Sequence, residues 1–220
     1  MVDLIRGLAA DQVRANLERV RVEIAETGRE PDQVEILAAV KYVPLEELDV
    51  LAQAGIRLLG ENRAQDLVAK ANAYPGRFMW DFIGHLQSRK VRELLRCVRY
   101  IQTVASDSAL EQLRRHGSPE TEVLVEVNVA GEQGKSGIAP AELPGFLERC
   151  PVTVVGLMTM PPLARSPEDS RPHFAALREL AERHRLHHLS MGTSQDYLVA
   201  VQEGATIVRL GGTLYGHGEA

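Results

Sequence analysis

The stretch VEILAAV, residues 34–40, is followed directly by Lys41 and decides the fold. A short apolar run that ends shortly before a proline, here Pro44, is typical of a buried strand that leads into the next element. A lysine at the mouth of such a strand is costly to desolvate unless it has a chemical task. The run therefore predicts a buried strand and a candidate functional residue at its carboxyl end.

Strand-like and helix-like segments alternate along the rest of the chain. This alternation favours a parallel sheet, and eight strand–helix units favour closure into a barrel over an open sheet. An amphipathic helix over residues 3–26 precedes them. We predict an α/β fold, a (β/α)8 TIM barrel with an extra N-terminal helix, as a single domain over residues 1–220. The predicted strands cover residues 34–40, 57–60, 78–83, 99–104, 122–129, 152–157, 187–190 and 206–210, and the predicted linking helices cover residues 45–54, 62–73, 87–95, 107–115, 140–149, 168–185 and 194–203.

The composition excludes several classes of protein. The chain has 220 residues and a net charge of −5, which gives no electrostatic footprint for nucleic acid. Its two cysteines, Cys97 and Cys150, have no metal-type spacing and predict no disulfide framework. The charged N-terminus is not a signal peptide, and no apolar run approaches the ~18 residues of a membrane span. We expect a soluble cytoplasmic protein that binds neither nucleic acid nor membrane.

The distinctive polar and glycine residues fall at the carboxyl ends of the predicted strands, where a barrel of this kind holds its active site. Because side chains alternate along a strand, Lys41 shares a face with Leu37, and Arg209 shares one with Ile207 and Gly211. If both faces point inward, Lys41 and Arg209 enter the same mouth. The alternatives are an exposed lysine just past a strand and an arginine in an ion pair at the rim of the core. The residues at the strand ends are Lys41, Glu61, Asn62, Gly84, His85, Asn128, Met158, Thr159, Ser190, Met191, Gly192, Arg209 and Gly211.

Two turns of small residues, 190–194 and 209–213, follow the last two predicted strands. Free N–H groups at a helix N-terminus bind phosphate, and the loops after strands seven and eight are where barrels often hold one. An ordinary helix cap by Thr193 or Ser194 is the alternative for the first turn. A lysine that forms a Schiff base, combined with a phosphate cup, suggests pyridoxal 5′-phosphate (PLP). Burial would lower the pKa of Lys41 and free its amine for this bond.

Arg209 has a chemical consequence if it faces the pyridine nitrogen of such a cofactor. A guanidinium only donates hydrogen bonds, so it would keep the ring nitrogen unprotonated. The ring would then be a weaker electron sink than one that is paired with a carboxylate.

Several motifs are similar to those of the pyridoxal phosphate homeostasis proteins, a family whose barrel resembles the N-terminal domain of alanine racemase. The resembling motifs are spread over residues 36–216, and together they are highly specific. They are Gly60-Glu61-Asn62, FIGHLQSRK (residues 82–90), Val127-Asn128-Val129, GKSG (134–137), GLMTM (156–160) and LSMG (189–192).

The resemblance implies that Lys41 holds PLP as an internal aldimine. It further implies that the chain binds, stores or delivers this cofactor with little or no catalysis, and that PLP-dependent apoenzymes are partners. The expected barrel lacks the domain through which barrel racemases dimerise, so we expect a monomer. We predict no catalytic residue and no metal ligand. The predicted cofactor-binding residues are Lys41, Asn62, Met191, Gly192, Ser194, Arg209, Gly211, Gly212 and Thr213.

Three positions depart from the family pattern. Asp81 stands where histidine is usual, and Arg89 replaces a common asparagine. Gly212 stands where a threonine or serine often contributes to phosphate binding, and Thr213 offers that hydroxyl one position later.

Two other functions stay open from the residues. The first is a PLP-dependent amino-acid racemase, which needs acid–base groups on both faces of its substrate. In barrel racemases the second base is a tyrosine from an additional C-terminal domain, and we expect no such domain because this chain stops at Ala220. The second is a cofactor-free lyase that uses Lys41 on a sugar phosphate. If the chain is such a lyase, the protein should carry no bound chromophore.

Overall fold

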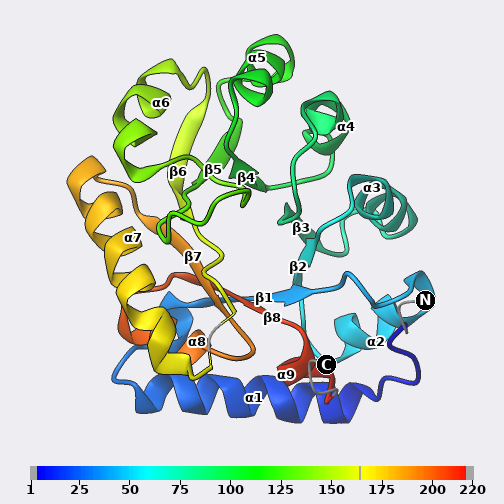
Figure 1. Ribbon diagram of the computed structural model, residues 1–220. Helices are drawn as coiled ribbons and strands as arrows, with labels where there is room; N and C mark the ends of the chain where they lie inside the picture. The colour runs from blue at the N-terminus through cyan, green and yellow to red at the C-terminus, as the bar shows by residue number, and fades with distance from the viewer. Residues whose placement is uncertain (1–3, 164, 217–220) are drawn as a thin grey trace.

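The barrel is closed, as the alternation of segments predicts. The computed structural model describes residues 4–163 and 165–216, in which eight parallel strands pair in sequence order and the last returns to the first (Figure 1). The strands are β1 (Glu35–Ala39), β2 (Leu58–Glu61), β3 (Met79–Phe82), β4 (Tyr100–Val104), β5 (Glu122–Glu126), β6 (Thr153–Met158), β7 (His188–Thr193) and β8 (Ile207–Leu210).

Helices connect the strands and surround the sheet (Figure 1). Pro144 and Pro172 lie in the first turns of two of them, where a missing N–H costs nothing. No helix in the described part of the chain combines the length and apolar character that crossing a membrane requires. The helices are α1 (Ala10–Glu26), α2 (Leu48–Gln53), α3 (Ala64–Ala73), α4 (Val91–Leu94), α5 (Asp107–His116), α6 (Leu143–Arg149), α7 (Arg171–His184), α8 (Tyr197–Gln202) and α9 (Gly212–Tyr215), and the 3-10 turns are η1 (Pro31–Gln33), η2 (Leu45–Glu47), η3 (Ser88–Lys90), η4 (Pro140–Glu142) and η5 (Pro167–Ser170).

The apolar core has two parts, as the period of two along the strands requires. Ala38 and Val40 belong to the larger part, which lies between the sheet and the helices. Leu37 and Ile207 belong to the smaller part inside the barrel, so the faces that they define in β1 and β8 point inward. The buried residues of the inner part are Leu37, Leu58, Tyr100, Leu124, Met158 and Ile207.

The predicted helix over residues 3–26 begins later, at Ala10. Its apolar stripe packs against the barrel beside α2, α8 and α9, as the periodicity predicts (Figure 1). Residues 4–9 are not helical, because Gly7 has a φ of 71° and its N–H donates to Glu47 at 2.7 Å. The N–H of Ile5 donates to the carbonyl of Tyr42 at 2.8 Å, so this segment is bound to the loop after β1.

Candidate functional site

Lys41 lies in a turn directly after β1, and the backbone of this turn is firmly held. Three donors from distant segments bind carbonyl groups on either side of Lys41. They are the Ile5 N–H to Tyr42 (2.8 Å), the Lys70 Nζ to Val40 (2.8 Å) and the Tyr215 hydroxyl to Ala39 (3.2 Å). The position of Lys41 at the carboxyl rim of the barrel is therefore set by tertiary contacts.

The side chain of Lys41 is exposed, and its Nζ lies 4.7 Å from the centre of the Tyr42 ring. The prediction that burial desolvates this amine is wrong. The reason is local, because β1 ends at Ala39 and the following turn carries Lys41 beyond the buried part of the strand.

Asn62 follows β2 and is exposed, but its backbone is anchored by a buried ion pair. Oε1 of Glu61 accepts the Asn62 N–H at 2.8 Å, and Oε2 of Glu61 lies 2.6 Å from Nζ of Lys70. Lys70 also donates to the carbonyl of Val40. One buried pair thus connects the turn that carries Lys41 to the turn that carries Asn62.

The two predicted phosphate turns meet in space. The hydroxyl oxygen of Ser194 accepts N–H bonds from Gly211 and Thr213, both at 3.3 Å. Gly192 has a φ of 89°, and a Cβ there would lie 2.6 Å from the Cβ of Ala200, so this glycine lets the turn pack on α8. The structure therefore brings Ser194, Gly211 and Thr213 together at one rim of the barrel.

The predicted opening of a helix at residue 194 is wrong. β7 continues through Thr193, and α8 begins at Tyr197. Thr193 pairs with Arg209 of β8, which keeps it extended. Its N–H and its hydroxyl both donate to Oδ1 of Asp196, at 2.7 and 3.1 Å. The Thr193 donors are therefore already occupied, and the turn offers fewer free groups than the sequence predicts.

Arg209 is 3% exposed and enters the barrel from β8. Its Nη1 donates to the Ser190 hydroxyl at 2.7 Å, and its Nη2 donates to the Thr159 carbonyl at 2.9 Å. Burial lowers the pKa of this guanidinium to about 10, and the charges of Asp196 and Glu126 oppose the shift. The close hydrogen-bond partners of Arg209 are thus a hydroxyl and a carbonyl. The alternative that Arg209 forms an ion pair with a carboxylate at the rim of the core does not match these contacts.

The Nε–H of Arg209 is buried and has no hydrogen-bond partner among residues 4–163 and 165–216. A buried donor without an acceptor costs about 1–3 kcal/mol. This site therefore fits a ligand atom that accepts a hydrogen bond and does not donate one.

Two buried charged residues near the rim are not among the predicted site residues. Lys70 is buried on α3, and its spacing of three from the buried Leu67 is the signal for that face. Glu126 alternates with Leu124, which places it on the inner face of β5. The Ser136 hydroxyl donates to Glu126 at 2.8 Å, and burial raises the pKa of the Glu126 carboxyl.

The three positions that depart from the family pattern lie in different places. Asp81 is fully buried inside the barrel and accepts two hydrogen bonds from Arg99. Arg89 lies in η3 and donates to the side chain of Gln87. Gly212 is the first residue of α9, directly beside the rim where Ser194 contacts its neighbours.

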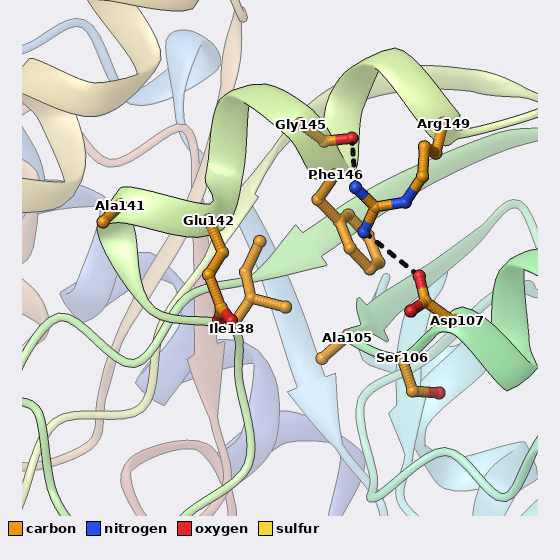
Figure 2. A pocket seen from close by; sticks show the side chains of 9 residues that line it. All are labelled: Ala105, Ser106, Asp107, Ile138, Ala141, Glu142, Gly145, Phe146 and Arg149. Atoms are coloured by element: carbon orange, nitrogen blue, oxygen red, sulfur yellow. Dashed lines mark hydrogen bonds and ion pairs between the residues drawn. The ribbon is translucent and has the colours of Figure 1, made fainter.

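A cavity of about 420 Å³ lies at the start of α5 and along α6, and none of the predicted cofactor residues lines it (Figure 2). Two of its polar side chains, those of Arg149 and Ser106, are bonded within the protein. Arg149 donates to Asp107 at 3.1 Å and to the Gly145 carbonyl at 2.8 Å, and Ser106 accepts the Ala109 N–H at the start of α5. The cavity is therefore separate from the predicted cofactor residues.

Comparisons with known proteins show to which sequences this chain is similar. The family model for the N-terminal domain of alanine racemase matches residues 8–219. A pyridoxal phosphate homeostasis protein of Aquifex aeolicus is 37% identical over 222 residues, which cover 94% of this chain and 97% of the relative.

Solved structures of two proteins are similar to this chain as well. The structure of PipY from Synechococcus elongatus with PLP bound matches with a TM-score of 0.78 at 30% identity, covering 93% of this chain and 100% of PipY. Alanine racemase from Corynebacterium glutamicum matches with a TM-score of 0.71 at 18% identity, covering 97% of this chain and 63% of the racemase. At that identity the likeness to the racemase shows the fold alone.

Proposed function

The chain belongs to the pyridoxal phosphate homeostasis proteins, and we propose from this that it binds PLP and acts in the storage and delivery of the cofactor. PLP supplies an electrophilic aldehyde, an aromatic ring nitrogen and a phosphate. Relatives with this name and the PLP-bound PipY structure support the proposal.

Lys41 is the proposed covalent anchor. The chain contains four lysines, and three of them have carboxylate partners: Lys70 with Glu61, Lys90 with Glu93 and Lys135 with Glu132. Among the described residues, Lys41 is the lysine that has no carboxylate partner. Its turn lies at the carboxyl rim of the barrel. A carbon–nitrogen double bond between Lys41 Nζ and the aldehyde carbon would form with release of water.

The observation that carries the proposal is the buried, unpartnered Nε–H of Arg209. An arginine only donates, whereas an unprotonated ring nitrogen only accepts, so the two groups satisfy each other. The rim that contains Ser194 supports phosphate binding on the same side of the barrel. Asn62, Met191, Gly192, Gly211, Gly212 and Thr213 complete the proposed cofactor contacts.

Little or no turnover is proposed, because a guanidinium leaves the ring nitrogen unprotonated and the ring a weak electron sink. The alternative is a racemase-like enzyme, which shares this barrel. An amino-acid turnover assay separates the two.

We further propose a monomer that works in the cytoplasm with PLP-dependent apoenzymes as partners. The free thiols of Cys97 and Cys150 are consistent with a reducing compartment.

The deciding experiment is the absorbance spectrum of the purified protein with added PLP, followed by borohydride reduction and peptide mapping. We expect a visible band and a reduced adduct on Lys41. Lys41→Ala should abolish the adduct, while Lys135→Ala, which removes another exposed lysine, should keep it. A wild-type protein that stays colourless and unmodified would overturn the proposal, and an adduct retained in Lys41→Ala would overturn the anchor.

A further inference from the structure

A chain of buried hydrogen bonds crosses the barrel interior from Asp81 to Arg209. Gln102 Nε2 donates to Asp81 Oδ2 at 2.7 Å, the Ser190 hydroxyl donates to Gln102 Oε1 at 2.6 Å, and Arg209 Nη1 donates to the Ser190 oxygen at 2.7 Å. The four residues come from β3, β4, β7 and β8. The first three are fully buried and Arg209 nearly so. The chain therefore joins four strands at the centre of the barrel.

Asp81 sets the direction of this chain because all of its contacts are donors. Arg99 donates to both of its oxygens, at 3.1 and 2.9 Å, and the Tyr100 N–H and the Gln102 amide add two more bonds. Burial raises the pKa of Asp81, while the Arg99 guanidinium and the Gln102 amide favour its charged form. With only donors around it, Asp81 acts as an acceptor, which is the role of a carboxylate.

The polarity of each later bond follows from that of the first. Gln102 must turn its amide nitrogen to Asp81, which leaves its amide oxygen for Ser190. Ser190 gives its one hydrogen to Gln102, so its lone pairs face Arg209. Because Thr159 accepts from Nη2, the planar guanidinium is held at two nitrogens and the direction of its Nε–H is fixed.

The guanidinium needs such a restraint because two acids attract it. The charges of Asp196 and Glu126 both act on Arg209. Each acid is held by other donors, Asp196 by Thr193 and Ser170, and Glu126 by Ser136. A buried polar network whose members are each held by several hydrogen bonds favours one arrangement over its alternatives.

We propose that Gln102 and Ser190, with their direction set by Asp81, are positioning residues that aim the Nε–H of Arg209 at the ring nitrogen of the bound cofactor. The inference rests on the proposed function and adds to it a determinant of ligand specificity. In this proposal the three residues act on the ligand through Arg209. The site would thereby bind an aromatic ring whose nitrogen accepts a hydrogen bond in preference to the same ring with a C–H group in place of that nitrogen.

The test compares the dissociation constants of PLP and of its 1-deaza analogue, in which a C–H replaces the ring nitrogen. Wild-type protein should hold PLP about tenfold more tightly, the ratio expected for one buried hydrogen bond. Gln102→Met preserves the length of the side chain but removes both bonds, and the ratio should fall towards one. Ser190→Ala is a smaller change and should lower the ratio in the same way. It replaces Gln102→Met as the test if that variant does not fold.

Thr103→Val is the matched control. It removes a buried hydrogen bond from the same strand, that of the Thr103 hydroxyl to the Gly84 carbonyl, without touching the chain to Arg209. Its ratio should equal that of the wild type. An unchanged ratio in folded Gln102→Met and Ser190→Ala would overturn the positioning role, as would a wild-type ratio of one. Wild-type protein that binds neither compound would overturn the proposed function itself, which is a distinct result.

Discussion

Gly192 shows how strictly one residue in the candidate site is constrained. Its φ of 89° lies in the left-handed region, and a Cβ would meet the Cβ of Ala200 at 2.6 Å and the Cα of Tyr197 at 3.0 Å. Gly192→Ala should lower the free energy of unfolding by about 2–4 kcal/mol, because left-handed strain adds to overpacking. Urea denaturation monitored by circular dichroism measures this loss.

Gly204→Ala is the control for that prediction. Gly204 has a similar φ of 96°, but the nearest atom to its Cβ would be 3.6 Å away. This variant should lose only about 1 kcal/mol, which is the strain alone. Equal losses in the two variants would mean that the contact of Gly192 with α8 has no energetic weight.

At the scale of elements, the buried Glu61–Lys70 pair joins α3 to the ends of β1 and β2. Lys70→Met would leave the Glu61 carboxylate buried without its cation, and we expect a loss of about 3–5 kcal/mol in the free energy of unfolding. Adding Glu61→Gln removes the stranded charge but keeps an acceptor for the Asn62 N–H, so the double variant should recover part of the loss. A double-mutant cycle in urea measures the coupling, and additive losses would contradict it.

For the whole molecule, the pH dependence of stability depends on the amino-terminal end of the barrel. His188 opens β7 beside Tyr100, and burial lowers its pKa below the usual 6.5, with Glu35 and Glu122 opposing and Arg99 and His187 reinforcing the shift. A depressed folded-state pKa contributes stability that is present above the unfolded pKa of about 6.5. That contribution is lost as the pH falls through the folded-state value.

We therefore expect the wild-type protein to lose stability as the pH is lowered from 7 to 5. His188→Gln keeps a polar side chain without a titrating imidazole and should show a smaller loss over the same range. Urea midpoints at several pH values measure both slopes. Identical slopes would show that His188 does not contribute to this pH dependence.

Much of the architecture follows from local patterns in the chain. The alternation of segments predicts the closed parallel barrel, and the period of two in β1 and β8 predicts which residues share a face. Such patterns repeat over many residues, so one misleading position changes little. The start of α1 and the end of β7 are two of the places where the structure departs from the local pattern, through contacts with Glu47 and Asp196.

The sequence by itself determined the family and the barrel, because short motifs and periodic burial are written in consecutive residues. Only the tertiary structure decided that Lys41 is exposed, that Lys70 supports its turn, and that Gln102 and Ser190 orient Arg209. These contacts join residues from separate strands and helices. Their geometry depends on how the closed barrel brings side chains together, which no local pattern records.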